Sequence, residues 1–358
     1  MQKVRILVID DSAFMRKAIS MMLESDPEIE VVGMAHNGED GLEMVKSLKP
    51  DLVTLDIEMP RMDGLTALRH IMSENPTPVM MISSLTTQGA AATLEALSLG
   101  AVDFIPKQLS YVALDIVKIK DELLSKVKHI ARNKARLGRA LSARPKQDAS
   151  KPKPALLMPS DNSSSKSPKK RINVVAIGTS TGGPPALQAI IPLLPKNLPV
   201  PVTVVQHMPP TFTKSLAERL DSLSQVSVKE AENGEPLKAG MVYIAPGGKH
   251  MTIKSRATGN EILLSDEPST TLHRPAVDIM VKSVAETYGS NVLGVILTGM
   301  GSDGLEGMRL VKQKGGSVYA QSESSCVVYG MPRVVVESSL ADKVVSLDNM
   351  AVEIVNSF

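Results

Sequence analysis

The 358-residue sequence predicts an α/β protein made of two parallel-sheet domains. Short apolar runs alternate with segments of helical spacing over residues 1–107, and the alternation resumes after Ile172. Such alternation is typical of parallel βαβ units with right-handed crossovers. Between the two regions lies a stretch rich in lysine, proline and serine, which has too few large apolar residues to form a core. We therefore expect two α/β domains joined by a linker.

Composition narrows the class of protein further. A hydrophobic share of 43% is ample for real cores, and no apolar run is long enough to span a membrane. The start, MQKVRILVIDDS, is typical of a charged strand rather than a signal peptide. The single cysteine, Cys326, rules out an internal disulfide framework, and we expect it to be a small core residue. We expect a cytoplasmic protein that is not inserted in a membrane.

Polar side chains follow the predicted strands of the first domain. The strands are expected at VRILVID, EIEVVGMA, DLVTLD, PVMMIS and VDFIP. Helices between them are indicated by the spacing of Ala18, Ile19 and Met22, and of Leu65, Leu68, Ile71 and Met72. Parallel sheets bind ligands beyond the carboxyl ends of their strands. The side chains expected there are Asp10, Asp11, Asp56, Ser83 and Lys107.

These side chains indicate a metal-assisted phosphate site. Carboxylates of Asp10, Asp11 and Asp56 at one sheet edge would repel one another unless a cation neutralised them. Hard oxygen ligands of this kind favour Mg²⁺. Lys107 and the Ser83 hydroxyl could then meet phosphoryl oxygens that the metal leaves free. Any one aspartate alone would be explained as a turn or cap residue, but five polar residues at successive strand ends favour a site.

The first third of the chain resembles a response-regulator receiver domain, a flavodoxin-like fold with a five-stranded parallel sheet. The resemblance rests on DDS at 10–12, LDIEMPRMDG at 55–64, ISS at 82–84 and the late Lys107. It implies that Asp56 accepts a phosphoryl group from a histidine kinase and that Asp10 and Asp11 hold Mg²⁺ with it. It also implies that Ser83 and Lys107 sense the phosphorylated state. One departure is the order Pro106-Lys107-Gln108, where receivers usually have Lys-Pro.

A basic linker is predicted after the first domain. The spacing of Val112, Ile116, Ile119, Leu123 and Leu124 predicts a long amphipathic helix beyond Tyr111. From Lys126 to Arg171 the chain has 14 lysines and arginines against two acidic residues. These charges are interleaved with serine, proline and alanine rather than aromatics, which favours a solvated linker rather than a nucleic-acid contact. We expect this linker to be flexible from about residue 140 to residue 170. The expected boundaries are 1–125 for the receiver domain, 126–170 for the linker and 171–358 for the second domain.

The second domain is predicted to be a doubly wound α/β domain, with a mostly parallel sheet and a β-hairpin insertion. Buried strands are expected at VPVTVVQ, VILTG and SVYAQ, and KVVSL could be an edge strand. Short antiparallel strands are expected at MVYIAPGG, HMTIKS and EILLSD, with Thr258-Gly259-Asn260 as a hairpin turn. Helices are expected at TFTKSLAERLDSL, RPAVDIMVKSVAETYG, DGLEGMRLVKQ and MAVEIVNSF.

The chemistry of this domain centres on RINVVAIGTSTGGPPALQAI, residues 171–190. An unbroken apolar run at Val174–Ile177 predicts a buried strand, and Pro184 or Pro185 can open a helix. Gly-Thr-Ser-Thr-Gly between them fits the pattern G-x-S-x-G, which exposes the Ser180 hydroxyl and points backbone N–H groups at it. The alternative is a loop that caps the helix or holds a phosphate.

A serine nucleophile needs a base, and the base needs an acceptor that orients it. His207 ends the strand VTVVQ, and Asp303 follows another strand, so both are expected at the sheet edge of Ser180. His250 and His273 are well explained as loop or capping residues, and Asp303 taken alone would be a helix cap. The order serine, histidine, aspartate differs from that of α/β-hydrolases, which indicates a different fold.

The second domain resembles the catalytic domain of the chemotaxis protein-glutamate methylesterases, the CheB family, whose members join a receiver to it. The resemblance rests on GTSTGGPPAL, QHMPPTFT, APGGKHM, HRPAVD, LTGMGSDG and YGMPR. It implies that Ser180 attacks a receptor glutamyl γ-methyl ester, that His207 moves the proton and that Asp303 orients His207. It implies too that Thr181 and the Met300 N–H surround the oxyanion, and that receptor glutamines can be deamidated. We expect no cofactor in this catalytic site.

The expected partners follow from the same resemblance. A chemotaxis histidine kinase is the phosphodonor, and methylated chemoreceptor helices are the substrate. The receiver would cover the active site until Asp56 is phosphorylated. We expect a monomer that does not bind nucleic acid. The alternatives are a receiver-controlled module whose glycine-rich loop binds a phosphate or a protein, and a DNA-binding regulator; the acidic second domain without a helix-turn-helix pattern disfavours the latter.

Overall fold

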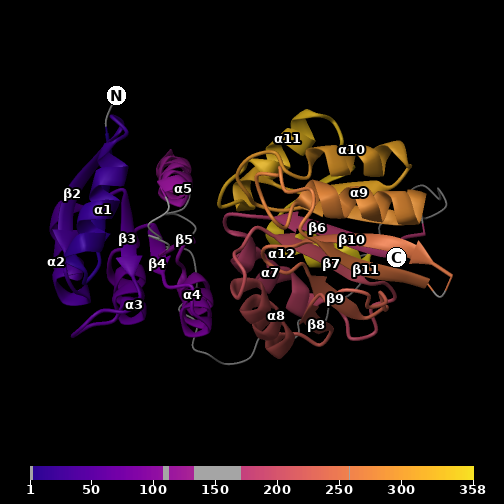
Figure 1. Ribbon diagram of the computed structural model, residues 1–358, viewed down its shortest axis with the longest axis horizontal. Coiled ribbons are helices and arrows are strands. Elements are labelled where there is room, and N and C mark those ends of the chain that lie inside the picture. Colours follow the sequence, from indigo (N-terminus) through magenta and orange to yellow (C-terminus); the bar gives the residue numbers. More distant parts are fainter. Residues whose placement is uncertain (1–2, 108–112, 133–170, 258) are drawn as a thin grey trace.

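The computed structural model describes residues 3–107, 113–132, 171–257 and 259–358, which form two α/β domains (Figure 1). The first has a five-stranded parallel sheet of order β2-β1-β3-β4-β5, which confirms the predicted architecture. Its elements are β1 (Val4–Ile9), α1 (Ala13–Glu24), β2 (Ile29–Ala35), α2 (Gly38–Leu48), β3 (Leu52–Asp56), α3 (Gly64–Glu74), β4 (Val79–Ser83), α4 (Thr87–Leu99), β5 (Asp103–Pro106) and α5 (Ala113–Arg132).

The second domain has a seven-stranded sheet of order β14-β13-β12-β6-β7-β9-β8. One core beneath the sheet includes α7, α8 and α12, and another on the opposite face includes α9, α10 and α11, so the domain is doubly wound as predicted. Its strands are β6 (Val174–Thr179), β7 (Val202–Gln206), β8 (Ser227–Glu230), β9 (Met241–Ile244), β10 (His250–Arg256), β11 (Gly259–Ser265), β12 (Val292–Ile296), β13 (Ser317–Gln321) and β14 (Lys343–Val345). Its α-helices are α7 (Gly183–Ile190), α8 (Phe212–Leu223), α9 (Val277–Tyr288), α10 (Leu305–Gln313), α11 (Met331–Glu337) and α12 (Leu347–Val355).

Two details of the second sheet differ from the sequence expectation. The expected antiparallel strand at MVYIAPGG is wrong, because β9 pairs in parallel with both β7 and β8. A short apolar run carries no information on strand direction, and residues 231–240 return the chain to the same end of the sheet. The short strand β8 at the sheet edge was not expected. The β10–β11 hairpin is confirmed as a separate antiparallel pair, although Thr258 of its turn lies outside the described residues.

The last helix of the receiver continues past residue 125, where the linker was expected to follow the domain. Helix α5 runs to Arg132, and both Val127 and Ile130 are fully buried in the receiver core beside Leu123. The apolar spacing simply continues through the point at which basic residues become frequent. The flexible segment expected at about 140–170 lies outside the described residues. None of the described helices, α5 included, combines the length and apolarity needed to cross a lipid bilayer.

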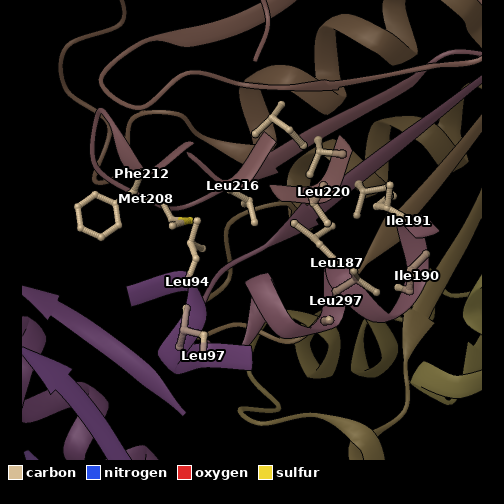
Figure 2. Packing of buried hydrophobic residues seen from close by; sticks show 14 of the residues in the cluster. Leu94, Leu97, Leu187, Ile190, Ile191, Met208, Phe212, Leu216, Leu220 and Leu297 are labelled. Atoms are coloured by element: carbon tan, nitrogen blue, oxygen red, sulfur yellow. The ribbon is translucent and has the colours of Figure 1, made fainter. Parts of the chain in front are cut away.

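The receiver packs against the second domain through α4 and β5. Leu94 and Leu97 of α4 point toward Met208 and the α7–α8 layer of the second domain (Figure 2), and these side chains share one buried cluster. Phe104 of β5 stacks on Phe212 of α8, with ring centroids 4.7 Å apart and planes inclined by 4°. This interface is therefore an apolar core shared by both domains.

Candidate functional sites

Ser180 directly follows β6, the strand from which the sheet is built outward in both directions. Strand β6 has β12 on one side and β7 on the other, which makes its end the topological switch point of the domain. Gly182, with φ of +76°, makes the turn, and helix α7 begins at Gly183 with prolines in its first turn. The strand–turn–helix geometry predicted for G-x-S-x-G is therefore confirmed. Gly178 stays within β6 rather than in the turn, and its missing side chain leaves room for Val277.

His207 and Asp303 meet at this end of the sheet. His207 Nε2 lies 2.7 Å from Asp303 Oδ2, and both side chains are largely buried. A carboxylate accepts the hydrogen, so neutral His207 carries its proton on Nε2 and leaves the lone pair on Nδ1. Among the described residues, this buried Nδ1 has no hydrogen-bond partner. The geometry therefore assigns Nδ1 as the nitrogen free to accept a proton.

Asp303 is held by a helix other than the one that follows it. The backbone N–H groups of Val277 and Asp278, at the start of α9, donate to its carboxylate at 2.7 and 2.9 Å. Burial raises the pKa of Asp303, but the His207 hydrogen bond and these two N–H donors outweigh burial, so the pKa lies below its ordinary value. Asp303 does accept hydrogen bonds from the start of a helix, as a helix cap would. The helix is α9, however, and not α10, which follows Asp303 in the chain.

The capping is reciprocal. Asp278 of α9 accepts a hydrogen bond from Gly307 N–H at the start of α10, at 2.6 Å. The start of α9 is thus held by Asp303, which lies just before α10, and the start of α10 is held by Asp278 of α9. These bonds fix both helix starts relative to each other. Burial raises the pKa of Asp278, with the Gly307 hydrogen bond opposing. This pairing fixes the position of the Asp303 carboxylate relative to the starts of α9 and α10.

The turn after β12 packs directly against the serine. Ser180 N–H donates to the Thr298 carbonyl at 3.1 Å, and a β-carbon on Gly299 would lie 3.0 Å from Ser180 Cβ. Met300 follows in the same turn. Thr181 is buried, and within the described part of the chain its Oγ1 has no hydrogen-bond partner. Thr181 and Met300 thus lie in the chain segments that surround Ser180.

His273 is a neighbour that the sequence interpretation missed. Its ring stacks on that of His207, with centroids 4.0 Å apart and planes inclined by 20°. Burial, followed by the nearby charge of His207, lowers the pKa of His273 to about 4. His250, by contrast, is a buried core residue: its Nδ1 accepts the Ala276 N–H, and its Nε2 lies 3.2 Å from the Pro268 carbonyl. The sequence feature that could have indicated this position is that His273 lies shortly before α9, the helix whose start holds Asp303.

The predicted receiver site also assembles. Oxygen atoms of Asp10, Asp11 and Asp56 all lie within 4.8 Å of one another, and Lys107 Nζ lies 2.7 Å from Asp56 Oδ2 and 3.2 Å from Asp10 Oδ2. Burial raises the pKa of Asp56 to about 6; the Lys107 hydrogen bond opposes this, and the charge of Asp10 adds to it. Crowded carboxylate oxygens of this kind match the donor set that Mg²⁺ prefers, so the residues fit that ion.

Ser83 links this site to the domain interface. It is fully buried, and its hydroxyl accepts from Thr93 Oγ1 at 2.6 Å and lies 3.2 Å from the Gly89 carbonyl. Both partners belong to α4, the helix that packs on the second domain. The backbone carbonyl of Ser83 also accepts the Lys107 N–H at 2.6 Å. Ser83 thus stands between Lys107 and α4.

Comparison with known proteins gives matches over nearly the whole chain. Residues 175–354 match the family model of the CheB methylesterase, and residues 6–116 match that of the response regulator receiver domain. A Nitratidesulfovibrio vulgaris protein named protein-glutamate methylesterase/protein-glutamine glutaminase 2 is 51% identical, and an Oleidesulfovibrio alaskensis protein named protein-glutamate methylesterase/protein-glutamine glutaminase 1 is 53% identical; each comparison covers 99% of both chains. The crystal structure of the Thermotoga maritima CheB methylesterase catalytic domain is 48% identical, with a TM-score of 0.51, over 52% of this chain and 99% of that one.

The role of the Asp303 carboxylate can be separated from its role as a cap. Asp303→Asn keeps an acceptor for α9 but loses the charge that fixes the Nε2–H tautomer of His207. We expect kcat for an activated ester such as p-nitrophenyl acetate to fall on the order of a thousandfold or more. Asp278→Asn is the matched control, since it changes the reciprocal cap without touching His207, and should keep most of the wild-type kcat. Equal losses in both variants would contradict the assignment.

Asp56 should make stability depend on pH. Its pKa in the folded protein, about 6, exceeds the unfolded value of 3.8, so the folded state binds more protons between these values. Stability conferred by the protonated carboxyl is therefore lost as pH rises from about 4 through 6. In chelator-treated protein, we expect Asp56→Asn to gain stability relative to wild type over this window, on the order of 2 kcal/mol, with a plateau above it. Urea unfolding at several pH values measures this; a difference that does not change with pH contradicts it.

Proposed function

This chain belongs to the CheB methylesterase family, and we propose that it is a phosphorylation-regulated protein-glutamate methylesterase of chemotaxis. It hydrolyses glutamyl γ-methyl esters on chemoreceptors to glutamate and methanol. The observation that carries the proposal is the pairing of His207 with Asp303 at the switch point that exposes Ser180. The names of full-length relatives support the same activity, and they include glutamine deamidation.

The reaction begins with the serine hydroxyl. Ser180 Oγ attacks the ester carbonyl carbon while its proton passes to His207 Nδ1, the nitrogen that Asp303 leaves free. The carbonyl π pair moves to oxygen and forms a tetrahedral oxyanion. The Thr181 hydroxyl and the backbone N–H of Met300 are our candidates to donate to this oxygen, because donors placed where charge develops lower the barrier most. Asp303 stabilises the imidazolium that forms at His207.

Collapse of the intermediate breaks the bond to the methoxy group. His207 returns its proton to this oxygen, so methanol leaves and an acyl ester remains on Ser180. A water molecule then gives a proton to His207 Nδ1 and attacks the acyl carbon. The second tetrahedral intermediate releases Ser180, which recovers its proton, and the product is the free glutamyl side chain. With a glutamine side chain as substrate the same steps apply, and ammonia leaves in place of methanol.

The receiver controls access to this centre in our proposal. Ser125 of α5 lies 3.1 Å from Met300 Sδ, and Glu122 and Lys126 of α5 are close enough to affect the pKa of His273. These contacts support a resting state in which α5 lies over His207 and His273. Mg²⁺ held by Asp10, Asp11 and Asp56 would supply positive charge for phosphoryl transfer from a histidine kinase. A phosphorylated Asp56 would change the partners of Lys107, which is joined through Ser83 to α4.

The nucleophile is tested by methanol release from methylated receptor. Ser180→Ala should reduce release to the background rate, because it removes the hydroxyl that forms the acyl intermediate in the proposed mechanism. Ser222→Ala, which removes a hydroxyl from the outside of α8, is the folding control and should match wild type. Release retained in Ser180→Ala removes this serine as nucleophile, and no release by wild type favours a binding module instead.

The regulatory part has its own test. A small-molecule phosphodonor with Mg²⁺ should raise methanol release by the full chain several-fold, since one doubly charged group is added beside the Lys107–Ser83 link. Asp56→Asn should keep the basal rate and lose the response. Equal stimulation of both proteins would show that Asp56 is not the acceptor.

A further inference from the structure

The side chain of Gln206 joins the nucleophile to the base through their backbones. Its Nε2 donates to the Ser180 carbonyl at 2.9 Å and to the His207 carbonyl at 3.1 Å. Gln206 is the last residue of β7 and is 2% exposed, so its carboxamide is shielded from solvent. We propose that Gln206 is a positioning residue that holds Ser180 and His207 in their reactive spacing. The proposal rests on the proposed serine hydrolase mechanism and adds a residue to it.

The sheet alone does not fix this spacing. The parallel ladder between β6 and β7 ends with the His207 N–H donating to the Thr179 carbonyl at 3.2 Å. Beyond that bond the two strands separate, because Ser180 enters the turn to α7 and His207 enters the segment before α8. The Ser180 N–H bonds toward the other side, to Thr298. The Gln206 amide therefore continues the tie between β6 and β7 by one more step, at the residues that react.

The orientation of the amide is set by the two carbonyl groups. Rotating it by half a turn would bring Oε1 against two carbonyl oxygens, whereas the observed orientation satisfies both with one NH₂ group. The consequence is that Oε1 is buried without a hydrogen-bond partner among the described residues. An unpaired buried acceptor is destabilising. The fold tolerates it here, which is expected where geometry at a reactive site outweighs local stability.

The neighbouring backbone is built around the same side chain. A β-carbon on Gly183 would overlap Gln206 Oε1 and would also crowd Thr179 Oγ1. Gly183 has no positive φ, so its small size serves close packing rather than an unusual backbone conformation. The amide thus occupies a fitted space between the end of β7 and the first turn of α7. A displaced Gln206 would shift the turn that carries Ser180.

The test compares two buried glutamines in the full, phosphodonor-activated chain. Gln206→Met keeps the volume but removes both donors, and should lower kcat by about 10- to 100-fold with KM within twofold, as expected for a misplaced reacting group. Gln321→Met is the matched control. Gln321 is also fully buried at a strand end, where it accepts the Thr298 N–H at 2.8 Å and donates to Ser325, but it contacts neither carbonyl. Gln321→Met should lose about as much thermal stability as Gln206→Met, and its kcat should fall much less.

A second variant gives a signature that a purely structural role would not. Gln206→Glu places a buried carboxyl opposite two carbonyl oxygens, and only its protonated form can donate to one of them. The ratio of variant to wild-type kcat should therefore rise as pH falls from 8 to 6. A ratio that is constant with pH, or a Gln206→Met kcat within twofold of wild type or equal to that of Gln321→Met, overturns the proposal.

The same variants are measured with p-nitrophenyl acetate as well as with methylated receptor. If wild type acylates Ser180 with the activated ester but releases no methanol from receptor, the proposed substrate fails while the role of Gln206 is still decided by the acylation rates. If wild type turns over both and Gln206→Met does too, the inference about Gln206 fails and the proposed function stands.

Discussion

The proposed active site depends on the carboxylate of Asp303, which accepts three hydrogen bonds. Asp303 accepts from His207 and from two backbone N–H groups at the start of α9, so its buried charge is compensated without a lysine or arginine. A helix N-terminus carries partial positive charge and favours an anion there. Asp278 of α9 in turn accepts a hydrogen bond from the Gly307 N–H at the start of α10. The two helices and Asp303 are therefore fixed relative to one another. The tautomer of His207, with the hydrogen on Nε2 and the lone pair on Nδ1, follows from this arrangement.

The proposed phosphorylation site and the domain interface meet at β5 and the residue that follows it. Lys107 meets the carboxylates of Asp56 and Asp10, while Phe104, earlier in the same segment, stacks on Phe212 of the second domain. Lys126 of α5 ties this strand to its helix, with Nζ 3.1 Å from Asp103 Oδ2 and 3.0 Å from the Phe104 carbonyl. A change of charge at Asp56 therefore acts on a short, tightly bonded segment whose other side is the interface. No long pathway is needed between the two.

Strand-end chemistry was predictable from the sequence because a parallel sheet brings all carboxyl ends to one edge. That rule placed Asp10, Asp56 and Lys107 together, and likewise Ser180 with His207. Contacts made by loops and helix starts were not predictable. The stack of His273 on His207 and the capping of α9 by Asp303 depend on how separate βα units pack, which local periodicity does not encode. The direction of β9 was missed for the same reason: length and hydropathy fix an element's existence, while tertiary packing fixes its partners.

The order serine, histidine, aspartate has a geometric reason in this sheet. The three residues follow β6, β7 and β12, and β6 lies between the other two. The chain thus brings the base from one neighbour of the serine strand and the acid from the other, so His207 must extend across the end of β6 to reach Asp303. In this arrangement Nε2 lies 2.7 Å from Asp303 Oδ2, and Nδ1 has no hydrogen-bond partner among the described residues. The position of His207 relative to Ser180 is then set by backbone rather than by a long side chain, which is why the Gln206 bridge between their carbonyl groups bears on reactivity.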